Sequence, residues 1–146
     1  MPATMEVTEN EILDRLKARW DADGDSSPFA LLYADVRGPS TPTDANTAWA
    51  KATVNFGSSE QASLVDNSGV KRWERTGFLT VQLFTPVGEG HTLSNKLKKT
   101  VVNAFEGHRT PNGVTFIESI RFVPIGSDGN WYQLNVLVPF ESDEIK

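Results

Sequence analysis

The chain of 146 residues contains no cysteine, and this absence removes several classes of function at once. Disulfide-stapled folds, thiolate catalysis, zinc fingers and iron–sulfur clusters all need cysteine thiols. Histidine is nearly as scarce: neither His91 nor His108 has a second histidine or a carboxylate at metal-ligand spacing. The sequence therefore predicts no metal, no cofactor and a core that is held together by packing alone.

Long apolar runs and strong basic clusters are also missing from the chain. No stretch approaches the ~20 apolar residues that a membrane-spanning helix needs, and no basic segment followed by an apolar run opens the sequence. Carboxylates outnumber basic side chains, 19 to 14, whereas a nucleic-acid binder needs clustered Lys and Arg to displace counterions from phosphates. We therefore expect a soluble protein with neither a membrane nor a specific nucleic acid as its partner.

Motifs that carry catalytic or ligand-binding chemistry are equally sparse. No serine lies in a Gly-x-Ser-x-Gly elbow. Gly88-Glu89-Gly90 precedes a predicted helix, but Glu89 would repel a phosphate, so the glycines indicate a turn with positive φ. The acidic run 21–28 resembles the start of a calcium loop, yet Leu32 stands where the bidentate Glu belongs. A hydrolase that uses a pair of carboxylic acids stays an alternative, although the sequence singles out no such pair. We predict no catalytic, cofactor-binding or metal-binding residues, and no enzymatic activity.

Hydrophobic periodicity predicts two helices and several strands. Thr8 and Glu11 have the spacing of a capping box, and the apolar residues after them recur at helical intervals, so the first helix should span 8–20. The second helix should end at Phe105, with Gly107 as its left-handed C-cap. Apolar patterns predict strands over 29–33, 51–56, 78–84, 114–122 and 131–140, and could add a short strand over 62–65.

This order of elements predicts an α+β fold: one domain over 1–146 with an antiparallel or mixed sheet and two helices packed on one face. The inward positions predict a core made of Leu13, Leu16, Leu79, Val81, Leu83, Leu97, Val101, Phe105, Leu134, Val136 and Val138. The segment 57–76 has weak periodicity and much Ser, Asn, Asp and Gly, which predicts a long, mobile hairpin arm. The charged tail 141–146 should be frayed.

Aromatic and basic residues gather in the segments that are least committed to this core. Trp20 should be buried, whereas three other tryptophans lie near loop or strand ends, where large rings often anchor an interface. Rings folded over the rim of the core are an equally good alternative. We predict a protein-interaction surface made of Trp49, Lys71, Arg72, Trp73, Arg75 and Trp131.

Three stretches carry a resemblance to a known family: Phe78 to Gly90, Phe105-Glu106-Gly107, and Trp131 to Phe140. In their order and spacing they resemble the tail terminator family of long-tailed (siphovirus-type) phages, typified by the lambda tail terminator. The resemblance implies a structural protein that forms a hexameric ring on the head-proximal end of the tail tube, stops tube growth and offers a surface to the head. It also implies three partners, namely further copies of the chain, the tail tube protein and a head-tail connector. The expected place of the protein is the virion tail, after assembly in the bacterial host cytoplasm.

Two other functions remain open at this point. A neighbouring phage role, as a head-tail connector or minor tail component, would use a similar α+β scaffold. A small enzyme or ligand-binding domain is the third hypothesis. Because a closed ring needs two different and complementary patches on each protomer, sizing the protein alone and with tail tube protein separates the phage roles from a monomeric enzyme.

Overall fold

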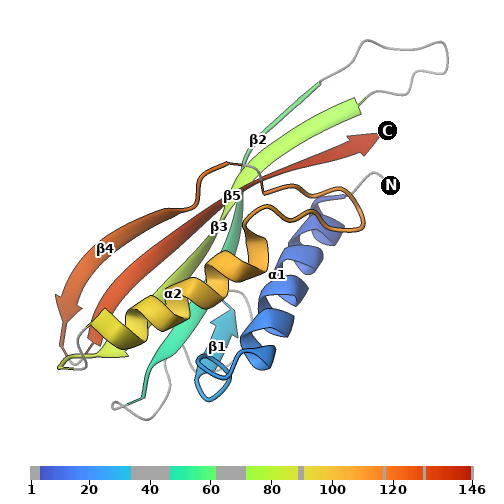
Figure 1. Cartoon of the computed structure of the whole chain (residues 1–146). Coiled ribbons are helices and arrows are strands. Elements are labelled where there is room, and N and C mark those ends of the chain that lie inside the picture. The colour runs from blue at the N-terminus through green and yellow to red at the C-terminus, as the bar shows by residue number, and fades with distance from the viewer. Residues whose placement is uncertain are drawn as a thin grey trace, which may run out of the picture.

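The computed structural model describes residues 4–33, 47–61, 72–88, 91–116, 118–129 and 131–145, and within them two helices cover one face of a five-stranded sheet (Figure 1). The helices are α1 (Met5–Ala22) and α2 (His91–Phe105). The strands are β1 (Ala30–Tyr33), β2 (Trp49–Gln61), β3 (Arg72–Pro86), β4 (Arg121–Asp128) and β5 (Trp131–Ile145). The predicted α+β fold is confirmed. The short strand predicted over 62–65 lies outside the described residues.

The strands lie in the order β1-β2-β3-β5-β4. β1 pairs with β2 in parallel and every other pair is antiparallel, so the sheet is mixed. β3 pairs with β5 along its whole length, from Arg72 opposite Ile145 to Pro86 opposite Trp131. The ends of β2, β3 and β5 extend past the end of α2 (Figure 1). We call this extension, residues 58–61, 72–76 and 141–145, the arm.

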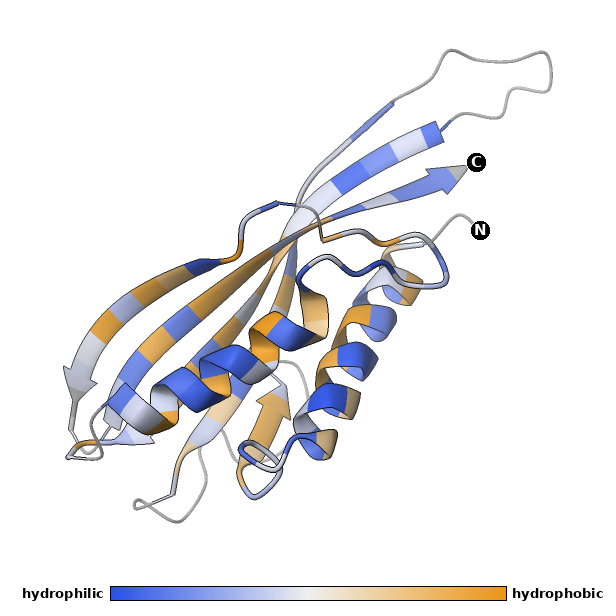
Figure 2. Cartoon of the chain, viewed as in Figure 1, coloured by the Kyte–Doolittle hydropathy of each residue, from blue (hydrophilic) through white to orange (hydrophobic). Residues whose placement is uncertain are grey.

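The core lies between the helices and the sheet face that they cover. Alternate residues of the central strands point to this face because side chains of a strand alternate between its two sides. The cross-strand partners Leu79 and Val138, for example, are both fully buried. Figure 2 shows these apolar positions as orange bands on the central strands and helices. Every residue of the predicted core is buried except Leu13, which is half-buried against the same cluster.

α1 begins one turn earlier than predicted. The Thr4 hydroxyl, and not that of Thr8, accepts a hydrogen bond from a free backbone N–H, that of Val7, at 3.2 Å. Thr8 instead lies inside the helix and is fully buried, and the Glu11 carboxylate has no hydrogen-bond partner among the described residues. The capping-box prediction was wrong because Thr4 supplies the same acceptor one turn upstream and no helix-breaking residue separates the two positions.

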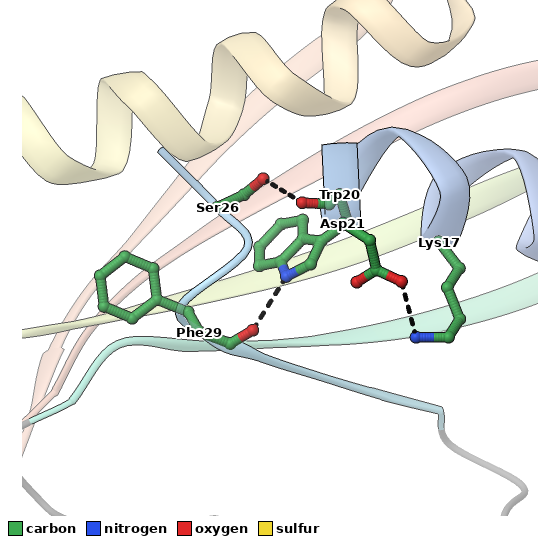
Figure 3. Close-up of polar contacts among 5 residues, drawn as sticks. All are labelled: Lys17, Trp20, Asp21, Ser26 and Phe29. Atoms are coloured by element: carbon green, nitrogen blue, oxygen red, sulfur yellow. Dashed lines mark hydrogen bonds and ion pairs between the residues drawn. The ribbon is translucent and has the colours of Figure 1, made fainter. Parts of the chain in front are cut away.

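The acidic run after α1 forms a compact, internally bonded turn. The Ser26 hydroxyl donates to the Trp20 carbonyl at 2.7 Å, and the Trp20 indole N–H donates to the Phe29 carbonyl at 2.9 Å (Figure 3). The Thr100 hydroxyl of α2 donates to the Asp23 carboxylate at 3.0 Å. These bonds fasten the end of α1 to α2 and to the residue before β1, so the turn sets how the two helices and the short edge strand meet.

A small dependence of stability on pH follows from Asp23. Hydrogen bonds from the backbone N–H of Asp25 and from the Thr100 hydroxyl lower the pKa of this carboxyl below its usual value. Its contribution is therefore present above the unfolded-state pKa and is lost as the pH falls through the lower folded-state pKa. We expect the free energy of unfolding to fall more between about pH 5 and about pH 3 in the wild type than in Asp23→Asn, by less than ~1 kcal/mol because the group is partly exposed. Urea unfolding at each pH measures the difference, and parallel curves would contradict the role of Asp23.

The strand predicted over 114–122 is wrong for most of its length. Gly113 has a φ of 88°, and among the described residues of 114–120 only Thr115 pairs with a strand, through two backbone hydrogen bonds to Glu141 of β5. Val114 and Phe116 are buried, and the ring of Phe116 lies 4.9 Å from that of Phe105. These two apolar residues therefore belong to a loop that packs on the end of α2, and the regular strand β4 starts only at Arg121.

The prediction of a frayed tail is also wrong for the described residues 141–145. Residues 141–145 continue β5 and pair with Arg72 to Thr76 of β3. Two ion pairs cross between these strands, because Arg72 and Arg75 of β3 lie beside Asp143 and Glu144 of β5. The charged sequence is therefore part of the sheet, and the hairpin arm predicted over 57–76 has a third strand at its base. Whether the arm is mobile stays a prediction, since 62–71 lies outside the described residues.

Candidate protein-interaction surface

The residues predicted as an interface do not form one surface. Trp49 and Trp131 lie at one end of the sheet, where Trp49 is opposite Phe84 of β3 and Trp131 is opposite Pro86. Arg72, Trp73 and Arg75 lie at the other end of β3, in the arm. Lys71 lies outside the described residues. The sequence therefore combined two groups that the fifteen-residue strand β3 keeps apart.

Trp49 belongs to the packing of the protomer itself. Its ring stacks on Phe84 with the ring centres 4.1 Å apart and meets the edge of Trp131 at 6.2 Å. Only 3% of Trp49 is exposed. The alternative reading, a ring folded over the rim of the core, fits this residue, whereas Trp73 and Trp131 are half-buried and keep part of their surface exposed.

The two arginines of the arm occupy very different environments. The Arg75 guanidinium is 2.6 Å from the Glu144 carboxylate, and the two side chains are only 4% and 17% exposed. Arg72 pairs with Asp143 at 3.1 Å, with side chains 48% and 44% exposed. Arg75 is therefore an internal part of the arm, and Arg72 is the one of this pair that a partner protein could contact.

An apolar strip that the sequence analysis missed lies on the edge strand β4. Phe122, Val123 and Ile125 are 42%, 38% and 54% exposed, which is unusual for three large apolar residues so close together. The signal that could have found them is Pro124, because proline inside a strand marks an edge or a bulge. The register of β4 on β5 indeed shifts between Pro124 and Gly126.

One hollow of the described surface, about 480 Å³, lies between α1 and α2 and includes Ala18, Ala104 and His108. One of its arginines, Arg15, is used inside the protomer, since its guanidinium donates to the Ala104 carbonyl near the end of α2. His108, three residues after the end of α2, is exposed.

Two negative findings apply to the described ranges only. Among residues 4–33, 47–61, 72–88, 91–116, 118–129 and 131–145, no three His, Asp or Glu side chains come together in a way that could hold a metal ion. Neither α1 nor α2 is long and apolar enough to cross a membrane.

A mixed sheet with helices on one face, an exposed apolar edge and a charged arm together define an α+β domain. The family of phage tail terminator proteins matches residues 11–140, from within α1 to the tenth residue of β5. The chain therefore belongs to the phage tail terminator family and is a structural protein of phage tails. The expected resemblance is confirmed at the level of this family. No sequence among the curated proteins matches the chain.

Solved structures show that the fold recurs at very low sequence identity. One protein superposes on this chain with a TM-score of 0.69 at 14% identity, covering 95% of each chain. A second chain, from the virion of a native gene transfer agent (GTA) particle, has a TM-score of 0.50 at 11% identity and covers 92% of this chain and 96% of its own length. At such identities the comparison establishes the fold alone.

Proposed function

We propose that this protein forms a hexameric ring on the head-proximal end of the tail tube, stops tube growth and provides the surface that the head joins. The observation that carries the proposal is the family match over residues 11–140. The GTA-particle chain supports it, because a protein with a similar fold is a component of a virion. The lambda-like form of the terminator belongs to this proposal too.

The role needs contacts with proteins and no chemical step, and the family suggests the same. Its partners are further copies of the chain, the tail tube protein and a head-tail connector, and assembly takes place in the bacterial host cytoplasm. A role as a neighbouring connector or minor tail component is the alternative outcome of the test below.

The docking residues that we propose are a narrower set than the sequence suggested. Trp49 and Arg75 are removed because both are 3% exposed and make contacts inside the protomer. Arg72 and Trp73 remain, on the arm, and Trp131 remains at the opposite end of the sheet. Lys71, which lies outside the described residues, stays in the set as the sequence neighbour of Arg72. An arm that projects past α2 can reach a neighbouring protein without any change in the helix-covered core (Figure 1).

The test changes the arm while leaving the core intact. We expect the double variant Arg72→Glu, Trp73→Ala to fold but to lose capping, since it removes a ring and reverses a half-exposed charge. Complementation of a terminator-deficient phage, with tail lengths measured by electron microscopy, should show overlong tails or tails without heads. Lys96→Glu, a charge reversal on the exposed side of α2, is the matched control and should complement fully.

The possible results separate the parts of the proposal. Full complementation by the arm variant would show that the docking residues lie elsewhere. Failure of the wild-type protein to complement would contradict the terminator role itself, and rescue of a connector-deficient phage instead would support the neighbouring role.

A further inference from the structure

The described part of the sheet has two open edges, and they lie on opposite sides of the protomer. β4 forms one edge, since it pairs with β5 on its other side. On the opposite side, β1 pairs only with Trp49 to Ala52 of β2, and no described strand pairs with the outer edge of β2 over 53–61. An open edge presents unpaired backbone N–H and C=O groups and is a template for pairing with another strand.

Within the described sheet, the exposed residues are concentrated on these two edges. All of Arg121 to Ile125 is exposed, and so is the outer end of β2 from Gly57 to Gln61. The central strands differ, because β3 has two exposed residues, Arg72 and Phe78, and β5 has none among its described side chains. In the protomer, Phe122 is covered in part by Lys98, whose Nζ lies 4.9 Å from the ring centre, and Val123 and Ile125 stay exposed.

The directions of the strands suit a second copy of the same chain. β2 is antiparallel to β3, β3 to β5, and β5 to β4, so β4 runs antiparallel to β2. A second copy whose strands run in the same direction would bring β4 of one copy beside β2 of the next as an antiparallel pair. Because Arg121 is level with Thr53, through Leu137 and Thr80, the copies must also be offset along the strands, about an axis tilted from them, for Arg121 to Val123 to pass the end of β1. The contact joins two different surfaces, which is the kind of interface that repeats around a closed ring.

We propose that β4 of one protomer adds to the open edge of β2, residues 53–61, of the next protomer. This inference rests on the proposed ring and names the surfaces that form it. Backbone hydrogen bonds between the strands would hold the register, and the exposed side chains of β4 would bury apolar area against the neighbour.

Pro124 and the bulge beside it limit the contact to part of β4. Proline has no N–H to donate, and the bulge interrupts the regular spacing after Pro124. The regular ladder therefore runs through Arg121 to Val123, with Ile125 adding apolar contact at its end. A short ladder of this kind lets each protomer accept one neighbour in one register instead of adding strands without limit.

Introduced cysteines test the arrangement cleanly, because the chain has none of its own. Val123 lies opposite Asn135 and Asn55 lies opposite Phe78, which places both on the sheet face away from the helices. Phe122 lies opposite the buried Val136, on the helix face, with an exposure of 42% against 38% for Val123. Val123→Cys and Phe122→Cys are thus a pair matched in exposure and opposite in face.

Each β4 cysteine is combined with one cysteine on β2, at one of the positions facing the same side as Val123: Thr53, Asn55, Ser58 and Glu60. At protein concentrations where sedimentation shows self-association, we expect an intermolecular disulfide ladder with Val123→Cys at one or two of these positions. The Phe122→Cys series should not form it, because side chains on opposite faces of a sheet cannot reach each other. No ladder at any of the four positions, equal ladders in both series, or a protein that stays monomeric at every concentration would each overturn the proposal.

A second measurement uses substitutions that do not touch the core. Val123→Asp with Ile125→Asp should weaken self-association at least about tenfold by analytical ultracentrifugation, which corresponds to ~1.4 kcal/mol. Val87→Asp is the control, since Val87 is 54% exposed like Ile125 but lies in the turn after β3. An equal loss in the control, or no loss in the β4 variant, would contradict the proposal. Both measurements use the purified protein. A failure of the strand interface would therefore leave phage complementation intact, and a failure of the terminator role would appear in complementation alone.

Discussion

We expect the Gly77→Ala substitution to lower the free energy of unfolding by about 3 kcal/mol or more. This is the upper end of the range for substitutions that overpack a closely packed site. A Cβ at this position would lie 2.3 Å from the Asn55 carbonyl oxygen and 2.7 Å from the ring of Phe140. The first contact is with the backbone of the neighbouring strand, so relief requires a shift of β2 against β3. Phe140 cannot move away easily either, since its ring packs edge-on against Phe56 at 5.4 Å.

A second glycine of the same strand pair provides the control. At Gly57 a Cβ would meet only the Thr76 carbonyl oxygen, at 3.7 Å, an ordinary contact. Gly57→Ala should therefore change stability by less than about 1 kcal/mol, and in the stabilising direction if the unfolded chain loses freedom. Chemical denaturation of both variants measures the difference. Equal stabilities would mean that the close approach at Gly77 relaxes without cost.

Arg75→Ala is expected to destabilise the protein by about 3–5 kcal/mol, because removing one partner leaves the other charge buried and unpaired. That partner is Glu144, which is 17% exposed, and its ion pair with Arg75 closes the arm between β3 and β5. Arg72→Ala, three residues earlier on the same strand, breaks a half-exposed pair and should cost less than about 1 kcal/mol.

The double variant Arg75→Met, Glu144→Met distinguishes two causes of destabilisation: the loss of the ion pair itself and the burial of an unpaired charge. Replacing both partners by apolar side chains should recover most of the stability lost in Arg75→Ala. Thermal and chemical unfolding of the three variants test the comparison. A loss in Arg75→Ala no greater than in Arg72→Ala would show that water reaches Glu144 in the arm and that burial does not set its energetics.

Local periodicity was enough to predict the core and most of the elements. Leu79, Val81 and Leu83 alternate along β3, and Leu97 and Val101 recur on one side of α2, and all five are fully buried. Such patterns follow from the two-residue repeat of a strand and the 3.6-residue repeat of a helix, so they need no knowledge of the partner element. Gly107 also ends α2 as predicted, with a φ of 72°.

The boundaries failed where two local signals competed or where burial had another cause. Thr4 and Thr8 are both possible caps, and only the packing of α1 decides between them. Val114 and Phe116 lie in a loop that packs into the core. Because they are two residues apart, they have the spacing of a strand, and the sequence pattern predicted one. The proposed site was the least predictable part, since Trp49 and Arg75 carry residue types common at interfaces and yet are buried in the protomer.

The sequence by itself determined which residues form the core, the α+β class and, through the match over 11–140, the phage tail terminator family. Only the tertiary structure decided which charged and aromatic residues remain available to partners. Whether a side chain is buried depends on the strand that lies beside it, and β3 takes its neighbours from segments far away in the chain. The charged residues 141–145 thus form a strand because β3 pairs with them along its backbone and supplies Arg72 and Arg75 as ion-pair partners. The apolar residues of β4 stay exposed because no described strand lies beyond that edge.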